Sequence, residues 1–299
     1  MNLAQRWRWW RERRRHHPPD EVHRAGELAE QRLAKIARAA GKANGWQVFE
    51  SVRIPDPEQG GKREIDLVVV GGNTVLVVEQ KHWSGSFEIN EHEEFIQHRK
   101  NGTEHNHSTV HQRIQRKARM LERLHVDRVG TKANLTFQVV LAFTNRNLAW
   151  PNSVHELDCL VSDEKGMIAL LEGEHPGETN LDVLETMAGF GTWDEVHLNG
   201  GLIRKGDVLD LGLGHDVAGW MSTRADEAKA TVAHARSLLS LLRERPTSVT
   251  WGHGQQRLKA DVPYGAMLKM HVVGQESPEE IPWSTVQGVL LSKPEGWND

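Results

Sequence analysis

The sequence contains very little cysteine and no long apolar run. Cys159 is the only cysteine among 299 residues, so no intramolecular disulfide can form, and this composition fits a reducing compartment. No stretch approaches the roughly 18 apolar residues that a membrane-spanning helix needs. No apolar stretch follows the N-terminal charges, as a signal peptide would require. We therefore expect a cytoplasmic protein with no membrane span.

Two functional classes lack support in the sequence. No Gly-x-x-x-x-Gly-Lys-Ser/Thr loop is present, so nothing indicates nucleotide hydrolysis, and no repeat of solenoid period occurs. The formal net charge of −4 argues against a uniformly basic coat for nucleic acid, although it leaves room for a local basic face. The length predicts about two domains.

The first 20 residues are rich in arginine and tryptophan, from Arg6 to Arg15. Such a segment could contact phosphates and stack on bases, or lie on a membrane surface. Because termini are usually loose, we interpret residues 1–20 as a basic, Trp-rich disordered tail that ends at Pro18-Pro19.

Residues 21–191 have the pattern of an α/β domain. Apolar spacing predicts helices over about 21–40, 109–126, 163–172 and 181–189. β-Branched runs predict strands over 46–54, 65–70, 74–79, 137–143 and 159–161. We expect a mixed sheet flanked by helices.

Residues 192–299 have a different character and are predicted to form a smaller, mostly β accessory domain. The sequence at its start is typical of a β-hairpin. Strands are expected near 248–251, 256–262, 266–273 and 286–291, with one helix over about 225–243. Nothing in this segment identifies a ligand, so it could recruit nucleic acid or a protein partner.

The strongest chemical signal is a hairpin that turns at Gly72-Asn73. With the turn there, Val70 faces Val75 and Val68 faces Val77, while Asp66 faces Glu79 and Glu64 faces Lys81. Alternation then places Asp66, Glu79 and Lys81 on one face, and Ile65, Leu67, Val69, Leu76 and Val78 on the other. Both faces are mostly apolar, which predicts a central hairpin buried on both sides.

Two carboxylates opposite each other in such a hairpin repel. A shared proton, a cation or exposure at the strand ends could offset the cost. Mg²⁺ or Mn²⁺ suits an all-oxygen site. Lys81 would then stand beside the ion, where an ammonium can act on water or on a phosphate. A solvated, charged hairpin end is the alternative.

This arrangement resembles the nuclease-related domain (NERD) family of the PD-(D/E)XK, restriction-endonuclease-like superfamily. The resemblance covers about residues 22–145. It comprises Gly26-Glu27-Leu28-Ala29-Glu30, Ile65-Asp66, Val78-Glu79-Gln80-Lys81 and Gly85, and a segment from Ser108 to Gln112 that is similar to the family's Asn-Pro-x-x-Gln. Ser108 and Thr109 depart from that pattern, which puts the role of Gln112 in doubt.

The resemblance implies a restriction-endonuclease-like fold and specific roles. Asp66, Glu79 and the carbonyl of Gln80 would ligate the metal, and Glu27 would join them directly or through water. Lys81 would work on the water or the scissile phosphate, and Gln112 would point at the site. The alternatives are that Glu27 and Gln112 are ordinary surface residues.

Two further features lie near these residues. Arg113, Arg116 and Lys117 could contact nucleic-acid phosphates, or form a solvated helix face. The polar, His-rich stretch over about 90–108 is interpreted as a lid or substrate loop, because zinc binding by His105, His107 and His111 would lack cysteine partners.

We therefore expect a Mg²⁺- or Mn²⁺-dependent nuclease that hydrolyses phosphodiester bonds in DNA, with RNA as an open alternative. The other reading is a catalytically inert module that binds nucleic acid or a protein. Retention of Asp66, Glu79 and Lys81 together favours the enzyme. The resemblance to this superfamily also suggests a homodimer, and the sequence itself leaves the oligomeric state open.

Overall fold

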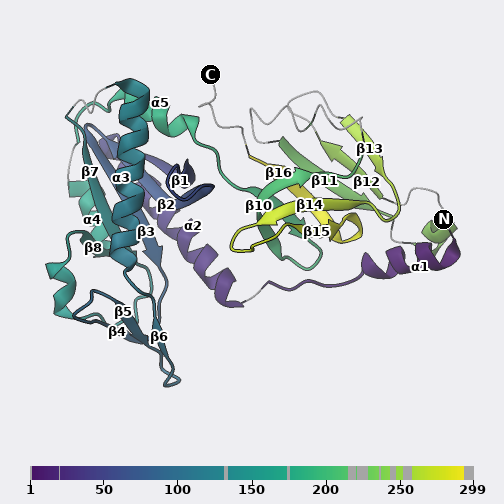
Figure 1. Cartoon of the computed structure of the whole chain (residues 1–299), viewed down its shortest axis with the longest axis horizontal. Helices are drawn as coiled ribbons and strands as arrows, with labels where there is room; N and C mark the ends of the chain where they lie inside the picture. Colours follow the sequence, from purple (N-terminus) through teal and green to yellow (C-terminus); the bar gives the residue numbers. More distant parts are fainter. Residues whose placement is uncertain are drawn as a thin grey trace. The chain divides into compact units, whose positions relative to one another are not determined.

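A computed structural model of the chain contains two compact units (Figure 1). It describes residues 2–19, 21–130, 134–173, 176–214, 220, 228–235, 237–242, 247–251 and 258–292. Residues 22–190 make up nearly all of one unit, called here the α/β unit; residues 1–21 and 191–295 form the other, called the β unit. None of the described helices is long and apolar enough to cross a membrane.

The α/β unit is built on a mixed five-stranded sheet of order β1-β2-β3-β7-β8. The first three strands are antiparallel neighbours, and β3, β7 and β8 run parallel. The strands are β1 (Gln47–Pro55), β2 (Lys62–Gly71), β3 (Thr74–Lys81), β7 (Thr136–Phe143) and β8 (Leu160–Asp163). The helices are α2 (Glu21–Gly41), α3 (Val110–Val129), α4 (Glu164–Gly173) and α5 (Leu181–Gly189). The expected α/β fold class, with a mixed sheet flanked by helices, is confirmed.

Helices cover both faces of this sheet. One buried cluster joins Val68, Val70, Val75 and Val77 to side chains of α3 and α5. A second joins Leu67, Val69, Leu76 and Val78 to α2 and α4. The β2–β3 hairpin is therefore buried on both sides, as its two apolar faces predict.

The turn at Gly72-Asn73 is where the sequence places it. The pairing runs from Gly71 opposite Thr74 to Leu67 opposite Val78, which is the expected register. Gly72 has φ 55°, and a Cβ there would lie 1.7 Å from the carbonyl oxygen of Pro176. Only glycine fits this turn without moving the neighbouring backbone.

The regular ladder stops at Asp66. The described pairing ends at Leu67 on the β3 side and skips Asp66 on the β1 side, where Ser51 has φ 48°. Ile65 packs in the same cluster as Val68, so the prediction that it shares a face with Leu67 is wrong. Because the ladder is interrupted at this residue, the alternation of strand residues does not determine the direction of the Asp66 side chain.

The His-rich stretch is not an irregular lid. It forms a small antiparallel sheet of β4 (Ser86–Ile89), β5 (Phe95–His98) and β6 (Glu104–Asn106). Trp83, Phe87, Phe95 and Phe143 pack together beneath it, with ring centroids 5.0–6.0 Å apart. The aromatic residues interspersed with the polar ones supply a core, and this corrects the loop interpretation.

The β unit contains an eight-stranded antiparallel sheet of order β13-β12-β11-β16-β9-β10-β14-β15. Its strands are β9 (Asp194–Leu198), β10 (Ile203–Asp210), β11 (Ala228–His234), β12 (Thr247–Trp251), β13 (Leu258–Val262), β14 (Met267–Val272), β15 (Glu279–Pro282) and β16 (Val286–Leu291). The mostly β accessory domain is thus confirmed. The helix expected over 225–243 is wrong for Ala228–His234, which pairs with β12 and β16 in the middle of the sheet; residues 225–227, 236 and 243 lie outside the described residues.

The N-terminal segment is not a loose tail. It forms α1 (Leu3–Glu12), capped by the Asn2 side chain, and belongs to the β unit. Trp9 is 2% exposed within the core of that unit and packs edge-on against Tyr264. Burial of one large aromatic side chain offsets the entropy of ordering this short helix.

Candidate active site

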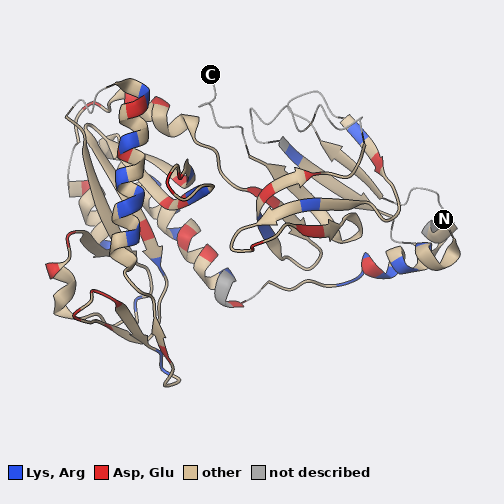
Figure 2. Ribbon diagram, in the orientation of Figure 1, with Lys and Arg blue, Asp and Glu red and all other residues tan. Residues whose placement is uncertain are grey.

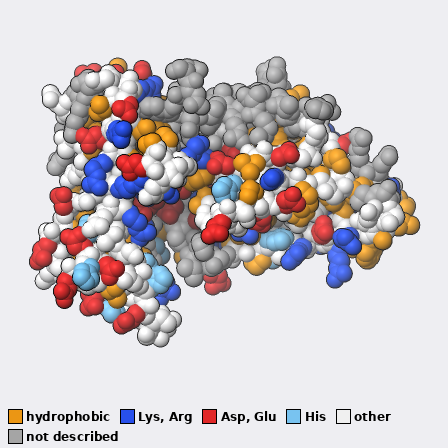
Figure 3. Space-filling view, viewed as in Figure 1, with side chains coloured by type: hydrophobic (Ala, Val, Ile, Leu, Met, Phe, Trp, Pro, Cys, Tyr) orange, Lys and Arg blue, Asp and Glu red, His pale blue; other side chains and the backbone are white. Residues whose placement is uncertain are grey.

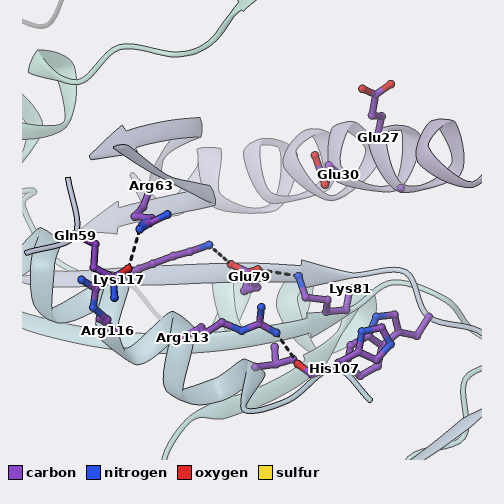
Figure 4. A pocket seen from close by; sticks show the side chains of 13 residues that line it. Glu27, Glu30, Gln59, Arg63, Glu79, Lys81, His107, Arg113, Arg116 and Lys117 are labelled. Atoms are coloured by element: carbon purple, nitrogen blue, oxygen red, sulfur yellow. Dashed lines mark hydrogen bonds and ion pairs between the residues drawn. The ribbon is translucent and has the colours of Figure 1, made fainter. Parts of the chain in front are cut away.

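A cleft of about 950 Å³ opens on the α/β unit above the hairpin end (Figure 4). Residues from α2, the β1–β2 loop, β3 and α3 line it. Five of its lining residues are basic: Arg63, Lys81, Arg113, Arg116 and Lys117. Three are acidic: Glu27, Glu30 and Glu79. A chain of net charge −4 therefore carries a cleft with a surplus of basic side chains.

Glu79 lies between two lysines. Its Oε1 accepts a hydrogen bond from Lys81 Nζ at 2.7 Å, and its Oε2 accepts one from Lys117 Nζ at 2.7 Å. Burial alone would raise the pKa of Glu79, but the two ammonium groups outweigh it and the pKa is lowered. Glu79 is therefore an anion held by two cations.

Asp66 lies against the backbone beside Glu79. Its Oδ2 accepts a 2.7 Å hydrogen bond from the Gln80 amide. Burial, followed by repulsion from Glu79, raises the pKa of Asp66 to about 7. The structure thus brings the two carboxylates into direct electrostatic contact, although Asp66 is not among the residues that line the cleft.

Lys81 bridges the two predicted ligands on β3. Its Nζ also donates to the carbonyl oxygen of Gln80 at 3.0 Å. Burial alone would lower the pKa of Lys81, but Glu79 and Asp66 outweigh it and the pKa is raised. Lys81 is therefore protonated, and in this state it is a hydrogen-bond donor rather than a base.

Two carboxylates approach from α2. Glu27 and Glu30 both line the cleft, but Figure 4 shows Glu27 pointing away from Glu79 while Glu30 lies on the side of the helix nearer to it. Glu30 also raises the pKa values of Asp66 and Lys81, which places its charge close to both groups. Sequence reasoning chose Glu27 and missed Glu30, three residues further along the same helix.

Basic residues recur along α3 (Figure 2), and their side chains have separate surroundings. Arg116 binds Asp56 with both terminal nitrogens, at 3.0 and 2.9 Å, and also pairs with Glu58 at 3.1 Å. Lys117 holds Glu79, and Arg113 donates to the backbone carbonyl of His107. All three line the cleft, but Arg116 and Lys117 already carry anionic partners.

Gln112 does not point into the cleft. It is exposed, and its amide donates to Glu93 at 2.9 Å. The structure therefore does not bring Gln112 together with Asp66, Glu79 and Lys81.

Sequence reasoning also missed His107 as a lining residue of this cleft. Its ring stacks on Trp83 with centroids 4.0 Å apart, and its Nε2 lies 3.0 Å from Gln97 Oε1. Burial, then the charge of His105, lowers the pKa of His107 to about 4, so its ring is neutral at physiological pH. The only signal in the sequence was its position just before the α3 helix.

The donor atoms fit a hard divalent cation. Asp66, Glu79 and the Gln80 carbonyl offer oxygens, which Mg²⁺ and Mn²⁺ prefer. An ammonium group already contacts Glu79 Oε1 and the Gln80 carbonyl, so positive charge is favoured at this place. Within the described residues no group of three or more His, Cys, Asp or Glu side chains is arranged to hold a metal. The other ligands of such an ion would be water molecules.

The residues that line the cleft lie in a segment that matches a known family model. Residues 25–144 match the family model described as the nuclease-related domain, NERD. That segment includes most of α2, strands β1 to β7 and α3, and it contains every residue that lines the cleft. No curated protein and no solved structure matches the chain. Over residues 25–144 the chain is therefore similar to the nuclease-related domain, and this match suggests a nuclease-related function.

Proposed function

We propose that the cleft hydrolyses phosphodiester bonds in DNA with the help of Mg²⁺ or Mn²⁺. The observation that carries the proposal is the cluster of Asp66, Glu79 and Lys81 beside a cleft with five basic side chains. A basic cleft attracts a phosphate backbone, and the acidic pair offers the hard ligands that phosphoryl chemistry uses.

Each residue has a role in this proposal. Asp66, Glu79 and the Gln80 carbonyl hold the ion, which when bound lowers the pKa of water and neutralises charge on the phosphate. Lys81, protonated beside Glu79, donates to the scissile phosphate as negative charge grows there. Arg113 contacts a flanking phosphate, and Glu30 approaches the ion through a water molecule, in the role that the resemblance implied for Glu27.

A second candidate is an inert module that binds nucleic acid. It is favoured by one observation: both oxygens of Glu79 are satisfied by lysines. RNA is an open substrate for either candidate, because the same ligands act on both backbones.

The test is cleavage of labelled single-stranded DNA, duplex DNA and RNA with Mg²⁺, with Mn²⁺ and with EDTA. We expect metal-dependent cleavage by the parent and by Glu91→Gln, an exposed control, and a loss of about 100-fold or more in Glu79→Gln. Titration calorimetry with Mn²⁺ should show weakened binding in Glu79→Gln. Retained nucleic-acid binding without cleavage under any condition would replace the enzyme with the inert module.

A further inference from the structure

Five large hydrophobic side chains lie exposed on two neighbouring elements of the β unit, α1 and the short 3-10 helix η5 (Leu238–Leu242). Their exposed fractions range from 50% to 71%. The elements are joined because the Arg6 guanidinium donates to the carbonyls of Leu241 and Leu242, at 3.4 and 3.5 Å. We call this group the apolar patch; it consists of Leu3, Trp7, Leu238, Leu239 and Leu242.

Exposed arginines adjoin the apolar patch. The segment from Asn2 to Arg15 has six arginines and one acidic residue. Four of these arginines, which we call the arginine rim, are exposed: Arg8, Arg11, Arg14 and Arg15. Figure 3 shows hydrophobic and basic side chains next to one another over α1. Apolar surface beside clustered arginine is the composition of an element that lies at a lipid–water interface.

The patch and the rim are presented by a folded element. Trp9 is buried in the β unit, Ser284 donates to Glu12 at 3.0 Å, and Asn199 donates to the carbonyl of Arg13 at 2.7 Å. Trp7 stacks on Trp10 with centroids 5.1 Å apart. The inner face of α1 is thereby fixed, and the opposite side of the helix is held outward without any cost of ordering on binding.

We propose that the apolar patch and the arginine rim dock the β unit on an anionic lipid surface. The arginines complement the negative headgroups, and the leucines and Trp7 enter the boundary of the acyl chains. A single-stranded nucleic acid would also attract arginine and stack on tryptophan, but it gives no role to four exposed leucines. The lipid surface accounts for both kinds of side chain.

The test is sedimentation of the full chain with vesicles, either phosphatidylcholine alone or phosphatidylcholine and phosphatidylglycerol in equal amounts. We expect binding to the anionic vesicles, and roughly tenfold weaker binding to the neutral ones. Leu239→Ser with Leu242→Ser should weaken anionic binding roughly tenfold, and Arg8→Glu with Arg11→Glu should weaken it at least as much. These four residues are exposed, so the thermal transition should stay unchanged.

Matched control variants test whether the loss of vesicle binding is specific to the apolar patch and the arginine rim. Leu181→Ser removes a leucine that is 73% exposed on the α/β unit, and Arg123→Glu reverses an exposed arginine of α3. Both should bind vesicles as the parent does, and so should Glu79→Gln. The lipid-docking proposal and the nuclease proposal are therefore tested independently of each other.

Three results would overturn the proposal. The parent could fail to sediment with anionic vesicles, it could bind neutral vesicles equally well, or the double leucine variant could bind as the parent does. If Arg8→Glu with Arg11→Glu instead abolished binding to a labelled oligothymidine while the leucine variant kept it, the surface would be a nucleic-acid site.

Discussion

At the scale of single residues, Lys117 competes with the proposed metal for Glu79. Its Nζ lies 2.7 Å from Glu79 Oε2, so a divalent cation on that carboxylate must displace or repel it. We predict that Lys117→Gln binds Mn²⁺ about tenfold more tightly, a gain of about 1.4 kcal/mol. Titration calorimetry measures the change.

The control for Lys117 is Arg119→Gln on the same helix. Arg119 is exposed and lines a separate cavity beside β7, so its substitution should leave Mn²⁺ affinity unchanged. Weaker Mn²⁺ binding by Lys117→Gln would mean that Lys117 orients Glu79 as a ligand rather than competing for it.

Asp66 makes the stability of the metal-free protein depend on pH. Its pKa rises from an ordinary 3.8 to about 7 because of burial and Glu79. The folded protein thus binds this proton more tightly than the unfolded chain does. The contribution of protonated Asp66 to the free energy of unfolding is fully present below about pH 3.8 and is lost as pH rises through about 7.

We predict that Asp66→Asn flattens this profile. The asparagine oxygen can still accept from the Gln80 amide, but it carries no charge. In EDTA the variant should melt a few degrees above the parent at pH 8, and the difference should shrink towards pH 4. Thermal unfolding followed by circular dichroism across this pH range measures the difference. If the melting temperatures of the two proteins change with pH in the same way, Asp66 titrates near its ordinary pKa.

At the scale of elements, Asp56 ties the β1–β2 loop to α3. It is buried, and its carboxylate accepts from Arg116 on α3 and from Arg63 on β2, both near 2.9 Å. Hydrogen bonds from Arg116 chiefly hold the pKa of Asp56 well below its usual range, so its stabilising effect persists into acid.

We predict that Asp56→Ala lowers the melting temperature by several degrees, because it leaves two guanidinium groups without their buried anion. Glu58→Ala is the matched control: Glu58 also pairs with Arg116, at 3.1 Å, but is exposed, and exposed pairs contribute little. Equal melting temperatures for the two variants would show that the loop is held by other contacts.

Elements with an unambiguous local pattern are predictable from the sequence. Gly72-Asn73 sets the hairpin turn, and two-residue periodicity then gives the register down to Leu67 and Val78. Asp66 is where this reasoning ends, because the ladder is interrupted there and its position depends on the Gln80 amide and Ser51. Contacts between distant segments, such as Lys117 with Glu79, leave no mark in local periodicity.

The wrong elements show the same limit. The segment from Ala228 to His234 has the alanines of a helix, yet it lies between β12 and β16, and sheet pairing overrides local propensity. In the His-rich stretch, polarity suggests a loop, while Phe87 and Phe95 meet Trp83 to build a core. The choice between Glu27 and Glu30 also needed the helix orientation, which depends on tertiary packing.

At the scale of the whole molecule, the N-terminal segment belongs to the β unit although the α/β unit separates them in sequence. Trp9 is 2% exposed in the core of the β unit, so Trp9→Ala should cost that unit about 3–5 kcal/mol. Trp7→Ala is the matched control, since Trp7 is 50% exposed and should cost the fold little. Hydrogen exchange read by mass spectrometry reports the two units separately. We expect faster exchange over 194–291 in Trp9→Ala, with unchanged protection over β3 and α3. Loss of protection in both units would mean that they unfold together, and α1 would then stabilise the cleft as well as the surface that it presents.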